Sequence, residues 1–90
     1  MRRLEESDVR GLLAERFADA LADYGVVDGN VPDDLDLMLE GIADSLGMMG
    51  LIVAVNEAAG REIDFEGLDA ERFTVVGHFC RFVADQTSGV

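Results

Sequence analysis

The hydroxyl of Ser45 is the group in this sequence best placed for covalent chemistry. The preceding segment, residues 28–44, contains six acidic residues and no basic one, whereas residues 45–56 carry no charge at all. Ser45 therefore lies where an acidic loop meets an apolar stretch of helical character. A single hydroxyl at such a junction is suited to covalent attachment of a group that is presented to other proteins.

Serine catalysis is a weaker interpretation of the same residue. A nucleophilic serine needs a base within hydrogen-bonding reach and a third group that orients the base. His78 is the only histidine, and no serine lies in a Gly-x-Ser-x-Gly motif. We expect His78 on or beside the core face of the last helix, where it would not serve Ser45.

Metal binding is also disfavoured by the spacing of the available ligands. His78 and Cys80 are two residues apart in a predicted helix, so their side chains point to different faces. Asp28 and Asn30 are spaced like the start of a calcium-binding loop, but Pro32 and Asp33 take the places of a ligand and of the required glycine. The acidic loop is therefore interpreted as a solvated surface.

The charge balance excludes several kinds of partner. The chain has 19 acidic residues against seven arginines, no lysine and a formal net charge of −12. Such a surface repels nucleic acids and anionic membranes and attracts basic patches on proteins. The single cysteine, Cys80, allows no intramolecular disulfide and fits a reducing compartment. A charged N-terminus, and apolar runs shorter than the ~20 residues of a membrane span, favour a cytoplasmic protein that does not contact membranes.

The periodicity predicts a single all-α domain over residues 1–90, with about residues 1–6 and 86–90 flexible. No window alternates polar and apolar residues for long enough to predict a sheet. The first helix is expected to begin with Ser7 as its cap and to end at Gly25. Its buried stripe comprises Val9, Leu12, Leu13, Phe17, Ala20, Leu21 and Tyr24.

A long loop and three further helices are expected after Gly25. The loop over residues 26–43 is predicted to be fastened to the core by Leu35, Leu37, Leu39 and Ile42. The second helix should run from Ser45 to about Ala59, with Gly60 as its stop. Residues 66–72 should form a short helix, and Thr74 should cap a last helix. The buried face of that last helix comprises Val76, Phe79, Cys80 and Val83.

The helix after Ser45 carries two apolar stripes. Met48, Leu51, Ile52, Val55 and Ala59 form one stripe, and Leu46, Met49 and Val53 form the other. A helix that is apolar all round is normally buried on all sides, as a central core helix would be. With few other helices available, the alternative is that the second stripe meets partner proteins, for which flexible Met side chains are suited. Gly47 and Gly50 each cost the helix roughly 1 kcal/mol relative to Ala, so they indicate close approach by a bulky group or by the neighbouring loop.

These residues together resemble the acyl carrier protein family. The resemblance rests on Asp44-Ser45-Leu46, the following apolar helix, the turn Gly60-Arg61-Glu62-Ile63-Asp64-Phe65, and Thr74-Val75 at the start of the last helix. It covers about residues 35–83. The fold it implies is a small four-helix bundle with a long loop between helices 1 and 2 and a short helix 3.

The resemblance implies a stand-alone carrier that is not itself an enzyme. Ser45 would carry 4′-phosphopantetheine, taken from coenzyme A, and acyl groups would travel on it as thioesters. Asp44 would help a phosphopantetheinyl transferase to dock, and Leu46, Met49, Val53 and Glu57 would meet the other partners. Those partners would be an acyl-loading enzyme and ketosynthase- or acyltransferase-type enzymes, and the carrier itself would be a monomer.

Several positions depart from the family pattern. The usual glycine three residues before the serine is replaced by Ile42, with Gly41 one residue earlier. Positions that are acidic in fatty-acid carriers are here Gly47, Gly50 and Asn56, and the turn before the last helix is about two residues longer. These departures favour a specialised pathway with apolar docking. The cargo stays open among polyketide, aminoacyl, hydroxyacyl and fatty acyl units, with a polyketide-type unit placed first, an aminoacyl unit second and ordinary fatty-acid synthesis third. An aminoacyl or peptidyl carrier, and a non-enzymatic helical adaptor with a Met-rich docking helix, remain alternatives.

Overall fold

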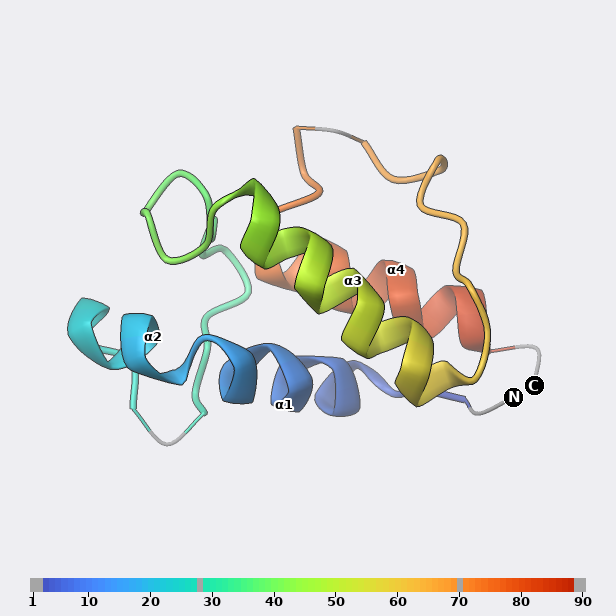
Figure 1. The fold of residues 1–90 in the computed structure, drawn as a ribbon, viewed down its shortest axis with the longest axis horizontal. Helices are drawn as coiled ribbons and strands as arrows, with labels where there is room; N and C mark the ends of the chain where they lie inside the picture. Colours follow the sequence, from blue (N-terminus) through green and yellow to red (C-terminus); the bar gives the residue numbers. More distant parts are fainter. Residues whose placement is uncertain (1–2, 28, 70, 89–90) are drawn as a thin grey trace.

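Four helices make up the fold of the described residues, which are 3–27, 29–69 and 71–88 of a computed structural model (Figure 1). They are α1 (Glu6–Arg16), α2 (Ala18–Tyr24), α3 (Ser45–Ala59) and α4 (Val76–Thr87). The described part contains no strand, and its β-type pairing is one isolated antiparallel bridge between Asp36 and Val75. The prediction of an all-helical fold is confirmed.

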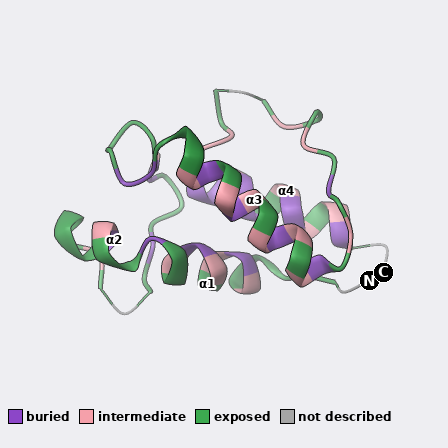
Figure 2. Cartoon of the chain, viewed as in Figure 1, coloured by how far each residue is buried: buried purple, intermediate pink, exposed green. Residues whose placement is uncertain are grey.

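The core lies where α1 packs against both α3 and α4. Each of these helices turns its buried side chains toward the others and leaves an exposed outer face (Figure 2). Four phenylalanines close one side of the core, because the ring of Phe65 lies 5.6–5.8 Å from the rings of Phe73, Phe79 and Phe82. The helical part of the core consists of Val9, Leu13, Phe17, Leu21, Met48, Leu51, Val55, Ala59, Val76, Phe79, Cys80 and Val83.

The expected first helix is divided in two at Phe17. The backbone of Phe17 leaves the helical region (φ −109°, ψ 25°), which ends α1 and allows α2 to begin in a new direction. Ser7 does not cap α1, because the helix starts two residues earlier than expected, at Glu6, and the Asp8 carboxylate accepts a hydrogen bond of 2.9 Å from the Glu5 backbone N–H. The expected end at Gly25 is confirmed, with Gly25 in the left-handed region at φ 107°.

The loop between α2 and α3 is fastened to the core by fewer leucines than expected. Leu35, Leu37 and Ile42 are buried as predicted, and Val31 joins them. Leu39 does not, because its side chain is 82% exposed. It lies at the tip of a turn in which the Asp36 carboxylate accepts hydrogen bonds from the backbone of residues 38 and 39. This turn holds the backbone without any contribution from the Leu39 side chain.

The expected short helix at residues 66–72 is not formed in the described residues. The chain makes separate turns there, at residues 66–67 and 71–74, and the stacked phenylalanines hold this segment in place of helical hydrogen bonds. Thr74 does not cap the last helix either. Val75 is the residue that precedes α4, and the Thr74 hydroxyl instead donates a 2.6 Å hydrogen bond to the Asp36 carboxylate.

Backbone pairing ties the loop to the start of α4. The Leu37 N–H donates to the Thr74 carbonyl at 2.9 Å, and the Val76 N–H donates to the Leu35 carbonyl at 2.9 Å. The Gly77 N–H donates to the Asp33 carbonyl at 2.8 Å, and a Cβ on Gly77 would lie only 3.0 Å from that carbonyl oxygen. A glycine at position 77 is therefore what allows the loop backbone to approach the first turn of α4.

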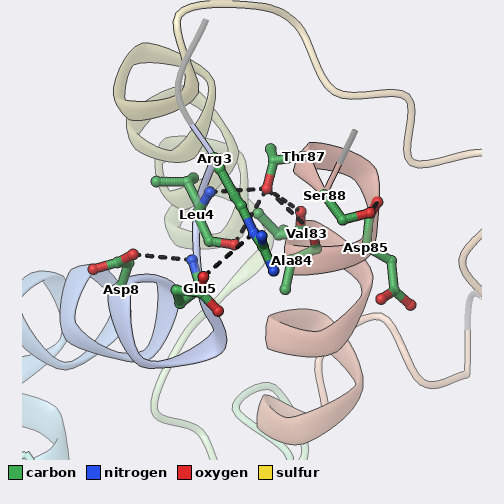
Figure 3. Close-up of polar contacts among 9 residues, drawn as sticks. All are labelled: Arg3, Leu4, Glu5, Asp8, Val83, Ala84, Asp85, Thr87 and Ser88. Atoms are coloured by element: carbon green, nitrogen blue, oxygen red, sulfur yellow. Dashed lines mark hydrogen bonds and ion pairs between the residues drawn. The ribbon is translucent and has the colours of Figure 1, made fainter. Parts of the chain in front are cut away.

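The two ends of the described chain are joined through a buried threonine (Figure 3). The Thr87 hydroxyl accepts a 2.9 Å hydrogen bond from the Leu4 backbone N–H and lies 3.1 Å from the Val83 carbonyl, to which it can donate. Both Leu4 and Thr87 are fully buried. The expectation that residues 1–6 and 86–90 are flexible is thus wrong for Leu4 and Thr87, because Thr87 continues the buried stripe of α4. Residues 1, 2, 89 and 90 lie outside the described residues.

Replacing Thr87 with valine should destabilise the protein by about 1–3 kcal/mol, because the buried Leu4 N–H loses its acceptor while the shape of the side chain is kept. The measurement is the free energy of unfolding from urea titration. Ser88→Ala, at the exposed next position, is the control and should change stability by less than about 0.5 kcal/mol. If Thr87→Val is as stable as the unchanged protein, the Leu4–Thr87 bond does not contribute as described.

Alanine substitutions at two helical glycines should have opposite effects. Gly77→Ala should cost about 1–3 kcal/mol, since the new methyl group would press on the Asp33 backbone. Gly11→Ala should stabilise by about 0.5–1 kcal/mol, because Gly11 lies in the exposed interior of α1 with open space around it. The same unfolding measurement compares the pair, and equal effects would contradict the close approach at Gly77.

Candidate attachment site at Ser45

Ser45 is the first residue of α3, and its side chain is exposed. Asp44, not Ser45, caps the helix, because the Asp44 carboxylate accepts a 2.7 Å hydrogen bond from the Gly47 N–H. Among the described residues the Ser45 hydroxyl makes no hydrogen bond. The hydroxyl therefore faces solvent with its oxygen available for a covalent bond.

The position of Ser45 is set by a tight turn immediately before α3. The Leu37 carbonyl accepts hydrogen bonds from the Ile42 N–H (2.8 Å) and the Ala43 N–H (3.0 Å), which closes the turn. Gly41 makes the reversal possible with φ 73°, a conformation that side chains disfavour. The Leu37 N–H also donates to the Thr74 carbonyl, just before α4. This hydrogen bond therefore helps to fix Leu37 and, through it, Ala43, which precedes Asp44 and Ser45.

Asp36 organises the other side of this turn. Its carboxylate accepts hydrogen bonds from the Thr74 hydroxyl, the Met38 N–H at 3.2 Å and the Leu39 N–H at 3.1 Å. The Thr74 hydroxyl, and to a smaller extent the two N–H groups, stabilise the ionised form and hold the pKa of Asp36 below its ordinary value. The carboxylate therefore fastens the turn most firmly when it is charged.

An open depression of about 520 Å³ lies beside Ser45. Its wall combines the end of α1, the turn before α3 and the first residues of α3. The lining residues are Phe17, Met38, Gly41, Ile42, Ala43, Asp44, Ser45 and Gly47. The hollow is open to solvent, and both apolar and polar groups line it.

The outer face of α3 carries the second apolar stripe as expected. Leu46, Met49 and Val53 are 76%, 62% and 55% exposed, whereas Met48, Leu51, Val55 and Ala59 are buried (Figure 2). Glu57 is exposed on the same side of the helix, four residues beyond Val53. The interpretation of α3 as a helix buried on all sides is therefore wrong: its exposed side carries the uncharged residues Leu46, Met49 and Val53, and the Arg16 guanidinium lies beside them against Gly50.

Both glycines at the start of α3 receive side chains from the end of α1. A Cβ on Gly47 would lie 3.2 Å from the Phe17 ring, and a Cβ on Gly50 would overlap the Arg16 guanidinium. The prediction that a bulky group approaches this helix is supported at both positions. Arg16 and Phe17, at the end of α1, therefore lie against the first turns of α3.

The remaining candidate residues lie away from this site or form no ligand cluster. Cys80 is fully buried on the core face of α4, and burial raises the pKa of its thiol to about 11, so the thiol is unreactive in the folded protein. His78 is half-buried on the same helix. Within the described residues, no three His, Cys, Asp or Glu side chains are grouped as metal ligands, and none of the helices has the length and hydrophobicity needed to cross a membrane.

Comparison with family models, with curated proteins and with solved structures finds no match for this chain.

The structure brings some of the predicted residues together and adds others. Asp44, Ser45 and Leu46 lie at the start of α3, and Met49, Val53 and Glu57 follow along its exposed face. Sequence reasoning missed Phe17 and Met38 as neighbours of Ser45. The sequence pattern places Phe17 in the buried stripe of one continuous helix, and no residue there marks the helix break. Met38 lies in an irregular loop, where no periodicity indicates which way a side chain points.

Replacing Thr74 with valine should raise the pKa of Asp36 toward its ordinary value, because the strongest donor to the carboxylate is removed. The measurement is the NMR titration of the Asp36 carboxyl carbon, with Ser88→Ala as the control that leaves it unchanged. Because the pKa of Asp36 is lower in the folded than in the unfolded state, the ionised carboxylate stabilises the fold at pH values above the unfolded-state pKa. This stabilisation is lost as the pH falls through the folded-state pKa. Thr74→Val should therefore lose less stability on acidification than the unchanged protein. An unaltered Asp36 titration would contradict the role of Thr74.

Proposed function

We propose that this protein is a stand-alone acyl carrier protein that carries 4′-phosphopantetheine on Ser45. The observation that supports the proposal most is an exposed serine hydroxyl at the first position of α3, next to an acidic cap and an exposed uncharged stripe. The resemblance of residues 35–83 to the family adds the spacing of the later turn and helix. The protein would carry acyl groups between enzymes and catalyse no step itself.

The attachment is a phosphoryl-type transfer from coenzyme A. The Ser45 Oγ attacks the phosphorus that bears the pantetheine, and a new Oγ–P bond forms. The P–O bond to the second phosphate breaks, adenosine 3′,5′-bisphosphate leaves, and the serine proton passes to a base on the transferase. The phosphodiester that results carries a negative charge, which the N–H groups and dipole at the N-terminus of α3 favour. Once attached, the group supplies a thiol that holds the cargo as a thioester.

The residues proposed for partner docking lie on the exposed side of α3. Asp44 would meet the phosphopantetheinyl transferase, and Leu46, Met49 and Val53 would contact loading, ketosynthase- and acyltransferase-type enzymes through apolar surface, with Glu57 at the far end. Flexible Met side chains suit a surface that meets several partners. Because residues 45–56 carry no charge, apolar contact has more weight here than charge pairing.

The cargo is proposed to be a polyketide-type starter or extender unit of a specialised pathway. The absence of acids at Gly47, Gly50 and Asn56 supports a set of partners different from that of fatty-acid carriers. An aminoacyl or peptidyl cargo is the second candidate within the same class. Mass spectrometry of the protein from its native host distinguishes these cargoes through the thioester that it carries.

Incubation of the apo-protein with coenzyme A, Mg²⁺ and a broad-specificity phosphopantetheinyl transferase should add the mass of one phosphopantetheine group. Ser45→Ala should abolish the gain, because no other residue offers the attachment oxygen at the start of α3. Ser7→Ala, at an exposed serine in the first turn of α1, is the matched control and should be modified like the unchanged protein. Intact mass is the measurement.

A gain that survives Ser45→Ala would contradict the attachment site. The absence of any gain would contradict the carrier function and leave the helical adaptor, with the α3 stripe as its docking surface, as the better interpretation. The dependence of partner affinity on salt tests apolar docking separately. A steep loss of affinity from low to high salt would show that charge pairing dominates.

A further inference from the structure

The depression beside Ser45 has a composition that suits a neutral apolar group. Phe17, Ile42 and Ala43 are buried and form its apolar part, and Met38, which is 41% exposed, stands at its edge. None of the eight lining residues is basic. The hollow thus offers nothing that would pair with a carboxylate or a phosphate, and the one ionised lining group, Asp44, is engaged with the Gly47 N–H.

Two glycines keep this hollow accessible. Gly41 has no side chain to fill the space, and a Cβ built on it would meet no atom within 4 Å. At Gly47 the Phe17 ring already lies within 3.2 Å of where a Cβ would be, so the ring closes that side of the hollow. The result is an open entrance at the turn and an aromatic wall toward α1.

We propose that this depression binds the pantoyl segment of the phosphopantetheine arm, an inference that rests on the proposed function. Pantoyl is the first unit after the phosphodiester and carries two methyl groups on one carbon. Because Ser45 itself lines the hollow, an arm attached at its Oγ begins at the edge of the apolar wall. The branched, uncharged pantoyl group is the part of the arm that matches this wall and is held nearest to it by the covalent bond.

The alternative course, along the outer face of α3, offers the arm less contact. The side chains there, Leu46, Met49 and Val53, project into solvent from a convex helix surface. A group in the hollow can contact Phe17, Ile42 and Met38 from more than one side, so that more of the group's own apolar surface leaves water than on a convex face. Placing pantoyl in the hollow also leaves the stripe on α3 free to contact a partner while the arm is attached.

The test uses NMR of the protein with ¹³C-labelled methionine methyl groups, before and after attachment of phosphopantetheine. Attachment should shift the Met38 methyl signal more than the Met49 signal, and nuclear Overhauser contacts should join the pantoyl methyl protons to Met38 and to the Phe17 ring. Met49 is the internal control, because it is exposed on the α3 stripe. Intact mass is recorded on the same sample to establish that the arm is attached.

Two exposed methionines provide the variants. Met38→Ala should reduce the contacts between the pantoyl methyl protons and Phe17, whereas Met49→Ala should leave them unchanged. Contacts to Met49 with none to Met38 would overturn the proposal in favour of an arm along α3. A full mass gain without contacts to either residue would overturn it in favour of a free arm, and both results leave the carrier function standing. No mass gain would overturn the carrier function and the pantoyl site together.

Discussion

Four hydrogen bonds join residues 33–37 to residues 74–77, and the position of Ser45 depends on them. Three are backbone bonds, and the fourth runs from the Thr74 hydroxyl to Asp36. They hold Leu37, whose carbonyl in turn closes the turn that leads into α3. Residues 74–77, much later in the chain, therefore help to fix where Ser45 stands. Buried backbone N–H and C=O groups need hydrogen-bond partners. A helix supplies them from its own backbone, whereas this loop obtains them from residues 74–77 and is held in one conformation by them.

The helix after Ser45 combines two opposed requirements. Its inner side must be apolar to fill the core between α1 and α4, and its outer side is apolar as well, although the protein as a whole carries a net charge of −12. Exposed apolar surface of this kind is tolerated when it is small or functional. The net charge of −12 opposes the approach of a second copy of the chain to this surface.

Helix α3 could be predicted to the residue because its signals are local. The uncharged run starts at Ser45, and Gly60 adopts the left-handed conformation that ends the helix. The break at Phe17 could not be predicted, since neither glycine nor proline marks it. The packing of the Phe17 ring against Gly47 of α3 is a tertiary contact that the local sequence does not show. The burial of Thr87 could not be predicted for a different reason. It continues the spacing of the buried stripe of α4, but a polar residue near the end of the chain is usually exposed to solvent. The other residues of that stripe are Val76, Phe79, Cys80 and Val83. At the site, the pattern predicted two apolar stripes on α3 but left open whether the second was buried or exposed. The depression depends on Phe17 and Met38, which only the folded loop brings together.

The hydrogen bond between Leu4 and Thr87 holds the two ends of the described chain together, so groups joined to either end attach to the same part of the molecule. Leu4 borders the same surface hollow as Ala58, near the C-terminal end of α3. Ser45 opens that helix thirteen residues earlier, roughly 20 Å away along its axis. The two ends of the described chain therefore lie near the C-terminal end of α3, whereas Ser45 begins that helix at its other end (Figure 1). A resin, a tag or a neighbouring domain joined at either end would attach near the C-terminal end of α3 and leave Ser45 accessible.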